Sequence, residues 1–206
     1  MIAKDNKTFI DNSSSVNKPG SAALRKINGE FITWLEENKL DKSHPLTPYL
    51  ADLITPEYGT LTAEDGQIMH YRLFKPTNYQ DGKKHPVIVN VYGGPHAQRV
   101  TNSWRSKNLY FQYMAQQGYV IFQLDNRGSY NRGKKFEDVI YKHLGVAEVA
   151  DQIKGVEFLR TLDYVDPERI GIYGHSYGGY MALMTMFKAG DYFKAGVSGA
   201  PVTDWA

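Results

Sequence analysis

The chain has 206 residues, of which 42% are hydrophobic and 22% are charged, and its formal net charge is +2. This composition is ordinary for a globular protein, and so small a charge does not indicate binding to nucleic acid or to a membrane surface. Because there are no cysteines, disulfides, thiolate zinc sites and a cysteine nucleophile are excluded.

Residues 1 to 40 have the pattern of short β-strands. Runs of β-type residues at 8 to 10, 22 to 27 and 31 to 35 are separated by turn residues at 11 to 15 and by Asn28-Gly29. Asn-Gly between two such runs is a strong signal for a hairpin. Strands this short cannot bury a core alone, so we interpret residues 1 to 40 as the end of a larger all-β unit, a β-propeller.

Residues 41 to 57 contain three prolines and are predicted to be a linker, and residues 58 to 206 are predicted to form a second domain. In this second domain strand patterns alternate with helix patterns, which predicts an α/β fold with a mostly parallel sheet. The expected strands are residues 60–63 and 68–74, joined as a hairpin, then 87–92, 119–124, 169–173 and 195–198. The expected helices are residues 104–117, 149–159 and 179–188, and Asp166-Pro167 is expected to form a turn. A basic cluster is interpreted as a solvated loop and comprises Arg127, Arg132, Lys134 and Lys135.

Residues 174 to 178 read Gly-His-Ser-Tyr-Gly and follow the apolar strand at 169 to 173. A strand that leads through Gly-x-Ser-x-Gly into a helix is the nucleophile elbow of serine hydrolases. Side chains two residues from the serine would collide with the neighbouring strand and helix, which explains the glycines. The pattern predicts Ser176 as the nucleophile of acyl transfer and the N–H of Tyr177 as an oxyanion donor. The alternative is a tight turn that contains an incidental serine.

The second oxyanion donor is expected in the loop after the first long buried strand, which here reads Tyr92-Gly93-Gly94-Pro95. Glycines in this loop would allow the backbone to approach a substrate closely. From spacing alone, Tyr92 is equally compatible with packing in the hydrophobic core and with a place in the active site.

No histidine follows Ser176, although the chain order of this fold places the base after the nucleophile. All six histidines are interpreted as structural. For His96, which follows Gly93-Gly94-Pro95, lining of the cleft is the alternative. Asp191 and Asp204 follow the serine, and each is interpreted as a loop residue. Without a base, the chain is expected to be a nearly inactive fragment of a longer enzyme.

Four motifs in this order resemble the prolyl oligopeptidase-type serine peptidases, and within them the bacterial dipeptidyl peptidase IV group. The motifs are residues 91–95 (VYGGP), 125–129 (DNRGS), 174–180 (GHSYGGY) and 200–205 (APVTDW). Residues 144–156 add further similarity, so that the resemblance covers nearly the whole chain.

The resemblance implies a peptidase that releases N-terminal dipeptides with penultimate proline or alanine through an acyl-enzyme on Ser176. It implies that the hydroxyl of Tyr92 joins the N–H of Tyr177 in the oxyanion hole. It also implies that Tyr177, Val202 and Trp205 line the pocket for proline, whose flat ring suits aromatic walls.

The resemblance further implies an incomplete α/β-hydrolase fold, preceded by the last strands of a β-propeller. It implies that the triad aspartate and histidine lie after residue 206, and that the acidic residues that bind the peptide N-terminus lie upstream. It implies a peptide substrate and a homodimer for the full-length enzyme. No cofactor and no metal are expected, the small charge argues against nucleic acid, and no apolar run is long enough for a membrane segment. Relatives are commonly periplasmic, although residues 1 to 12 lack the apolar core of a signal peptide. The alternatives are an acylaminoacyl peptidase or esterase of the same fold, and a non-catalytic α/β scaffold.

Overall fold

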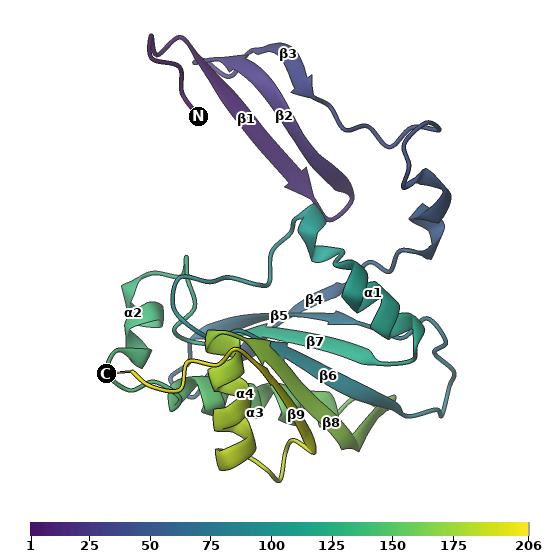
Figure 1. Cartoon of the computed structure of the whole chain (residues 1–206), viewed down its shortest axis with the longest axis vertical. Helices are drawn as coiled ribbons and strands as arrows, with labels where there is room; N and C mark the ends of the chain where they lie inside the picture. The colour runs from purple at the N-terminus through teal and green to yellow at the C-terminus, as the bar shows by residue number, and fades with distance from the viewer. Residues whose placement is uncertain (206) are drawn as a thin grey trace. The chain divides into compact units, whose positions relative to one another are not determined.

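The computed structural model describes residues 1–205, apart from the side chain of Ser106, and Ala206 lies outside the described residues. The chain divides into two compact units, and each is described by itself. The first unit comprises Met1–Thr55 and Thr101–Asn108, and the second comprises Pro56–Val100 and Leu109–Ala206. Figure 1 shows the elements in chain order.

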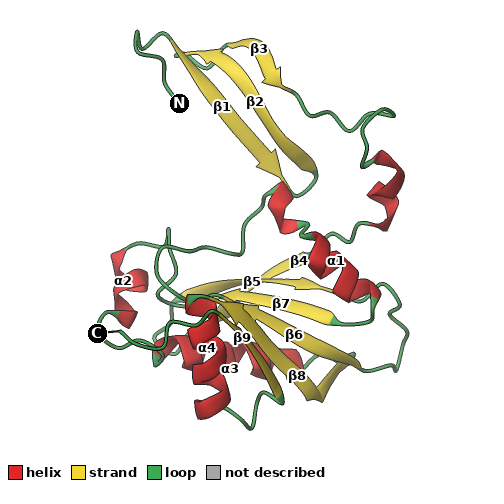
Figure 2. Ribbon diagram, viewed as in Figure 1, coloured by secondary structure: helices red, strands yellow, loops and turns green. Residues whose placement is uncertain are grey.

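The first unit is a three-stranded antiparallel sheet (Figure 2) of β1 (Thr8–Ser15), β2 (Lys18–Lys26) and β3 (Phe31–Glu36). The hairpin expected at Asn28-Gly29 joins β2 to β3, and Gly29 has a φ of 92°. The turn expected at residues 11 to 15 is wrong. These residues continue β1 because they pair with β2, as Asp11 does with Ala23.

The first unit buries few side chains. Every residue of β3 is exposed, including the large side chains of Phe31, Ile32, Trp34 and Leu35. The linker region holds a 3-10 helix, η1 (Thr47–Asp52), and a second, η2 (Trp104–Ser106), also belongs to this unit. Three short strands cannot enclose a core, as expected from the sequence.

The second unit is built on a six-stranded mixed sheet. Its strands are β4 (Glu57–Thr62), β5 (Ile68–Phe74), β6 (His85–Val91), β7 (Val120–Asp125), β8 (Val165–His175) and β9 (Ala195–Gly199). The spatial order is β4-β5-β7-β6-β8-β9, with antiparallel pairing from β4 to β7 and parallel pairing from β7 to β9. The predicted mixed α/β architecture with a parallel sheet is therefore confirmed.

Helices cover this sheet. They are α1 (Leu109–Gln116), α2 (Lys134–Glu137), η3 (Asp138–Ile140), α3 (Ala147–Arg160) and α4 (Tyr177–Lys188). In Figure 1, α3 and α4 lie together on one face of the sheet and α1 lies on the other. None of the helices within residues 1–205 has the length and apolar character needed to cross a membrane.

Two expectations for residues 58–206 are wrong. The helix expected at 104–117 is divided into η2 and α1, which lie in different units. The turn expected at Asp166-Pro167 lies inside β8. Val165 pairs with His85 of β6, the register then shifts, and pairing continues from Ile170 with Val87.

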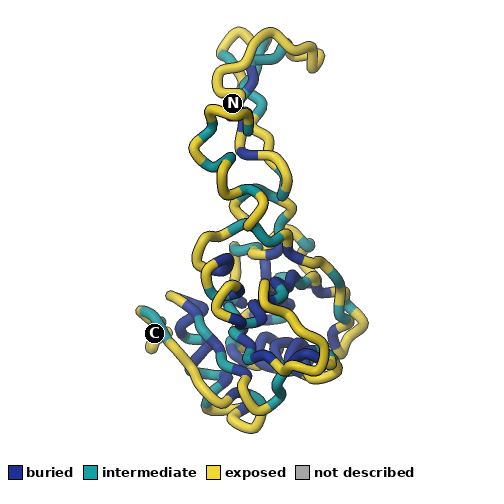
Figure 3. The backbone as a smooth tube through the Cα atoms, turned by 90° about the vertical axis from the view of Figure 1, so that its right-hand side faces the viewer, coloured by how far each residue is buried: buried dark blue, intermediate teal, exposed yellow. Residues whose placement is uncertain are grey.

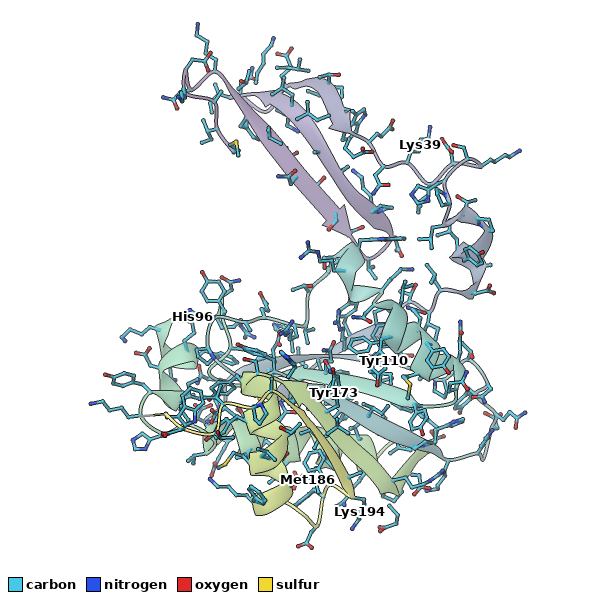
Figure 4. All side chains as sticks on the ribbon, in the orientation of Figure 1. Lys39, His96, Tyr110, Tyr173, Met186 and Lys194 are labelled. Atoms are coloured by element: carbon cyan, nitrogen blue, oxygen red, sulfur yellow. The ribbon has the colours of Figure 1, made fainter. Side chains whose placement is uncertain are left out.

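The core lies in the second unit, as the buried residues in Figure 3 show. Every residue of β7 is buried, which is typical of a strand covered on both faces. On the α1 face, Tyr110 and Tyr173 lie with their ring centroids 6.2 Å apart (Figure 4), beside a groove of about 710 Å³.

The parallel strands place the sequence motifs at one edge of the sheet. Because β6, β7, β8 and β9 run in the same direction, their carboxyl ends meet there. The segments that follow these four ends are residues 92–100 (called the Tyr92 loop), residues 126–129, the turn at Ser176 and residues 200–205. Ligands of α/β sheets bind at such an edge.

Candidate active site

Ser176 lies in a sharp turn between β8 and α4. Its φ of 60° and ψ of −121° are rare for a residue with a side chain, and such strain persists only where the surroundings enforce it. The Ser176 N–H donates to the carbonyl of Gly199, 2.9 Å away, and the Ser176 carbonyl accepts the N–H of Tyr180 at 3.0 Å. The predicted strand–serine–helix arrangement is therefore present.

The glycines on either side of Ser176 lie where no side chain fits. A Cβ on Gly174 would collide with the carbonyl of Gly178 and lie 2.7 Å from the carbonyl oxygen of Val91. A Cβ on Gly178 would collide with the same Val91 oxygen and lie 3.1 Å from the Cα of Tyr92. The elbow is thus pressed against the end of β6, where the Tyr92 loop begins.

The two residues predicted to supply the oxyanion donors, Tyr92 and Tyr177, have neighbouring rings. Tyr177 is the first residue of α4, where N–H groups have no acceptor within the helix and the helix dipole is positive. The ring of the half-buried Tyr92 lies 6.0 Å from the ring of Tyr177, between centroids, and the Arg99 guanidinium lies 4.7 Å from the Tyr92 ring. A Cβ on Gly94 would collide with the Tyr177 ring, so the loop packs directly on it. The catalytic roles of these residues stay predictions.

Asn126, directly after β7, anchors the Tyr92 loop through hydrogen bonds of its side chain. Its side-chain amide donates to the carbonyls of Gly93 at 2.9 Å and Arg127 at 2.7 Å. Its side-chain oxygen accepts a hydrogen bond of 2.8 Å from Gln152 of α3. Asn126 is completely buried, so these bonds form away from water. The sequence showed Asn126 only as part of a family motif and gave no sign of this role.

Asp125, at the end of β7, holds the far end of the same loop. Its carboxylate accepts the backbone N–H groups of Arg99 and Val100, each at 2.9 Å. Burial raises the pKa of Asp125, while these two N–H groups oppose the rise. Two consecutive residues of one strand end therefore hold both ends of the segment from Gly93 to Val100.

Arg127 is buried, so its interpretation as part of a solvated loop is wrong. Its guanidinium binds the carboxylate of Asp151 in a two-point contact, with Nη2–Oδ1 at 2.7 Å and Nε–Oδ2 at 3.0 Å. Its Nη1 lies 3.1 Å from Oδ2 of Asp65. The hydrogen bond with Asp151 raises the pKa of Arg127, which therefore stays charged. This ion pair connects the end of β7 to α3 and to the β4–β5 hairpin.

Aromatic rings gather beside the elbow. The ring of Trp205 lies 5.4 Å from that of Tyr177 and 5.3 Å from that of Tyr180, and the two tyrosine rings are 5.4 Å apart. Val202 lies half-buried in the same segment as Trp205. Tyr180 was not predicted as a site residue, although its spacing of three from Tyr177 places both on one helix face.

A cavity of about 650 Å³ adjoins these rings. Its lining includes Tyr180, Trp205, Pro95, His96, Ile140 and Leu144. His96, which was interpreted as structural with a cleft-lining position as the alternative, lines this cavity, and its ring lies 6.0 Å from that of Tyr130. The largely apolar lining suits an apolar group of a ligand.

The Tyr177 side chain is almost fully buried, and its hydroxyl donates a hydrogen bond of 2.6 Å to Oε1 of Glu148. Burial and the Glu148 carboxylate raise the pKa of Tyr177, so the phenol stays protonated. Within residues 1–205, no group of three or more histidine, aspartate or glutamate side chains is arranged to hold a metal ion.

Comparison with known proteins identifies relatives of the chain. A model of the prolyl oligopeptidase family matches residues 104–206, half of the chain. Human dipeptidyl peptidase 8 is 39% identical over 209 residues, which cover 96% of this chain and 22% of that protein.

Two crystal structures are similar along the whole chain. One, from Bacteroides ovatus and assigned as a dipeptidyl aminopeptidase IV, has a TM-score of 0.90 at 42% identity and is covered to 29% of its length. The other, Porphyromonas gingivalis dipeptidyl peptidase 4, has a TM-score of 0.87 at 30% identity and is also covered to 29%. The chain therefore spans less than a third of the length of these relatives.

Proposed function

Since this chain belongs to the prolyl oligopeptidase family, we propose that the whole protein is a serine peptidase that releases dipeptides from the N-terminus of peptides. The similarity to dipeptidyl peptidases of human and bacterial origin supports this substrate class. The observation that carries the proposal is the strained Ser176 at the start of α4, directly before Tyr177, whose ring lies near those of Tyr92 and Trp205.

In the proposed reaction, the Ser176 hydroxyl attacks the carbonyl carbon of the penultimate residue. The new C–O bond converts that carbonyl oxygen into an oxyanion, which accepts hydrogen bonds from the Tyr177 N–H and the Tyr92 hydroxyl. A histidine–aspartate pair elsewhere in the whole protein takes the serine proton and delivers it to the departing amine as the C–N bond breaks. Water then attacks the acyl-enzyme and releases the dipeptide.

The preference for penultimate proline is proposed to come from the aromatic cluster. Tyr177, Val202 and Trp205 are the proposed pocket residues, and Tyr180 completes the group of rings. A proline ring is flat and apolar and has no N–H, so it gains from contact with such rings without a lost hydrogen bond.

The domain organisation is also a proposal. We assign residues 1–40 to the end of a β-propeller, residues 41–57 to a linker and residues 58–206 to the N-terminal part of an α/β-hydrolase domain. The antiparallel sheet of the first unit and the parallel strands of the second support this assignment.

The test measures turnover of a glycyl-proline chromogenic amide by the whole protein, beside a glycyl-leucine amide, an acylated amino-acid amide and a simple ester. We expect the proline substrate to be preferred and Ser176→Ala to abolish its turnover. Tyr92→Phe should lower kcat by about 100-fold, as the loss of one oxyanion donor does. Ser14→Ala, at an exposed serine of β1, is the matched control and should leave turnover unchanged.

Two results would contradict the proposal. Turnover of the ester or the acylated amino-acid amide, but not of the proline dipeptide, would indicate an esterase or acylaminoacyl peptidase. An unchanged rate in the Ser176→Ala variant would remove Ser176 from the reaction altogether.

A further inference from the structure

Glu148 is a completely buried carboxylate that the proposed chemistry does not use. It lies in the first turn of α3, where Oε1 accepts the N–H of Gly145 at 3.0 Å and Oε2 accepts the N–H of Val146 at 3.1 Å. A buried charge is costly unless hydrogen bonds and favourable dipoles compensate for it. The two N–H groups and the positive end of the α3 dipole provide this compensation.

The remaining bond of this carboxylate reaches across to the elbow. Oε1 of Glu148 also accepts the hydroxyl of Tyr177, at 2.6 Å, which is the short distance typical of a charge-assisted O–H bond. Tyr177 is therefore held at both ends, since its backbone begins α4 next to Ser176 and its phenol is tied to α3.

The turn before α3 is itself held in place. Gly145 has a φ of 73°, and a Cβ there would lie 2.6 Å from the hydroxyl oxygen of Tyr180. Lys188, the last residue of α4, donates to the Gly145 carbonyl at 2.9 Å. The turn that precedes Glu148 is thus packed against α4, the helix that begins with Tyr177. The Glu148 carboxylate therefore has little freedom to move.

We infer that Glu148 is a positioning residue, whose carboxylate fixes the phenol of Tyr177 and thereby the placement of the Tyr177 amide and ring. The amide is the proposed oxyanion donor and the ring is a wall of the proposed pocket. The hydrogen bond between Tyr177 and Glu148 therefore positions both groups. This inference rests on the proposed function for the identity of the reaction.

A carboxylate is better suited to this place than an amide of the same shape. Both oxygens of Glu148 accept N–H groups, so a glutamine would direct its own N–H₂ at a donor, either at Val146 or at Gly145 and Tyr177. Glu148→Gln therefore weakens the anchor with almost no change of volume. Tyr177→Phe removes only the hydroxyl and keeps the ring.

The experiment is a double-mutant cycle on the whole protein with Glu148→Gln, Tyr177→Phe and the combined variant. Two rates are measured, kcat/KM for the proline dipeptide substrate and the rate at which a fluorophosphonate labels Ser176. Melting temperature is measured in parallel. The matched control is the exposed pair Tyr192–Glu157, whose hydroxyl–carboxylate distance is 3.4 Å, changed by Tyr192→Phe and Glu157→Gln.

If Glu148 positions Tyr177, each single change should lower both rates by about tenfold, since small displacements of catalytic groups have effects of this size or larger. The combined variant should be no slower than the slower single variant, because both changes break the same bond. The control pair should stay within about twofold of the unchanged protein.

The inference is overturned if Tyr177→Phe keeps both rates within about twofold while the melting temperature falls, since Glu148 would then be only structural. It is also overturned if the two single effects multiply in the combined variant.

Labelling needs Ser176 and the oxyanion donors but no proline pocket. Normal labelling without dipeptide turnover would therefore overturn the proposed substrate, and the labelling rates of the variants would still decide the role of Glu148. If the unchanged protein neither labels nor turns over the dipeptide, both the proposed function and the role of Glu148 are overturned.

Discussion

The side-chain amide of Asn126 donates a hydrogen bond of 2.9 Å to the carbonyl of Gly93, and this bond joins the end of β7 to the loop that carries Tyr92. The loop follows β6 and contacts the elbow after β8 through Tyr177. Three neighbouring strand ends therefore meet in one bonded arrangement, and a change in any of them should reach Ser176.

Asn126→Ala is expected to lower the free energy of unfolding by about 2 kcal/mol, because it leaves the buried Gly93 carbonyl without its donor. It should also lower kcat of the whole protein by about tenfold, because the Tyr92 loop loses its anchor. Urea denaturation and turnover of the proline substrate check the two effects.

Asn90→Ala is the matched control for this prediction. Asn90 accepts a hydrogen bond of 2.5 Å from Gln123 within the sheet, and its loss leaves the Asn126–Gly93 bond intact. A similar fall in kcat for both variants would contradict the proposed anchoring role of Asn126.

Gly178→Ala is expected to destabilise the second unit by more than about 2 kcal/mol and to abolish labelling of Ser176. The added Cβ would collide with the Val91 carbonyl, so either β6 or α4 must move, and overpacking on this scale is costly. Gly190→Ala is the control, since its Cβ would come no closer than 3.4 Å to the Met186 carbonyl. Thermal denaturation and fluorophosphonate labelling of both variants provide the comparison, and normal labelling of Gly178→Ala would show that the crowding is tolerated.

Asp151→Ala is expected to cost about 3 kcal/mol of stability, because it leaves the buried Arg127 guanidinium without its main partner. Asp166→Ala removes the same type of partner from Arg169, whose side chain is 56% exposed, and should cost less than about 1 kcal/mol. Chemical denaturation of the two variants measures both values. If the two variants lost equal stability, burial would not make the Arg127–Asp151 ion pair more important than the exposed Arg169–Asp166 pair.

Tyr164 should make the protein less stable in alkaline solution. Burial raises its pKa from 10.0 to about 12, so the unfolded chain releases this proton at lower pH than the folded protein does. Below pH 10 its contribution to stability is fully present, and between pH 10 and about 12 the unfolded state binds fewer protons, so stability falls with rising pH. The expected loss from Tyr164 is about 2 kcal/mol.

Urea denaturation across this pH range, compared between the unchanged protein and Tyr164→Phe, tests the prediction. The variant should lose less stability as pH rises, and parallel curves would count against a buried phenol. Tyr141→Phe, at a side chain that is 70% exposed, controls for the loss of a tyrosine as such.

Local patterns in the sequence were sufficient to predict most of the elements. The apolar run at 87–92 and the Asn28-Gly29 turn identify strands and a hairpin because their signals are short-range. The strand character of residues 11–15 was missed, since polar residues extend β1 only through pairing with β2. The extension of β8 past Pro167 was missed for the same reason, because Val165 is held by His85 on another strand.

The candidate active site also has a part that local sequence predicts and a part that it does not. The elbow could be predicted from five consecutive residues, because its steric demands act within the turn. The contact of Glu148 with Tyr177, and that of Asn126 with Gly93, join residues far apart in the chain. No periodicity or spacing encodes such contacts, so only the folded arrangement reveals which buried polar groups support Ser176.

The hydrogen bond from the Ser176 amide to the Gly199 carbonyl has a consequence for the order of events during protein synthesis. A strained backbone persists only when its surroundings enforce it, and part of the surroundings of Ser176 is made later, when β9 pairs with β8. A nascent chain that has emerged only as far as α4 therefore carries the serine but not its elbow. Ser176 therefore reaches the backbone conformation of the elbow only after Gly199 has left the ribosome and β9 has paired with β8.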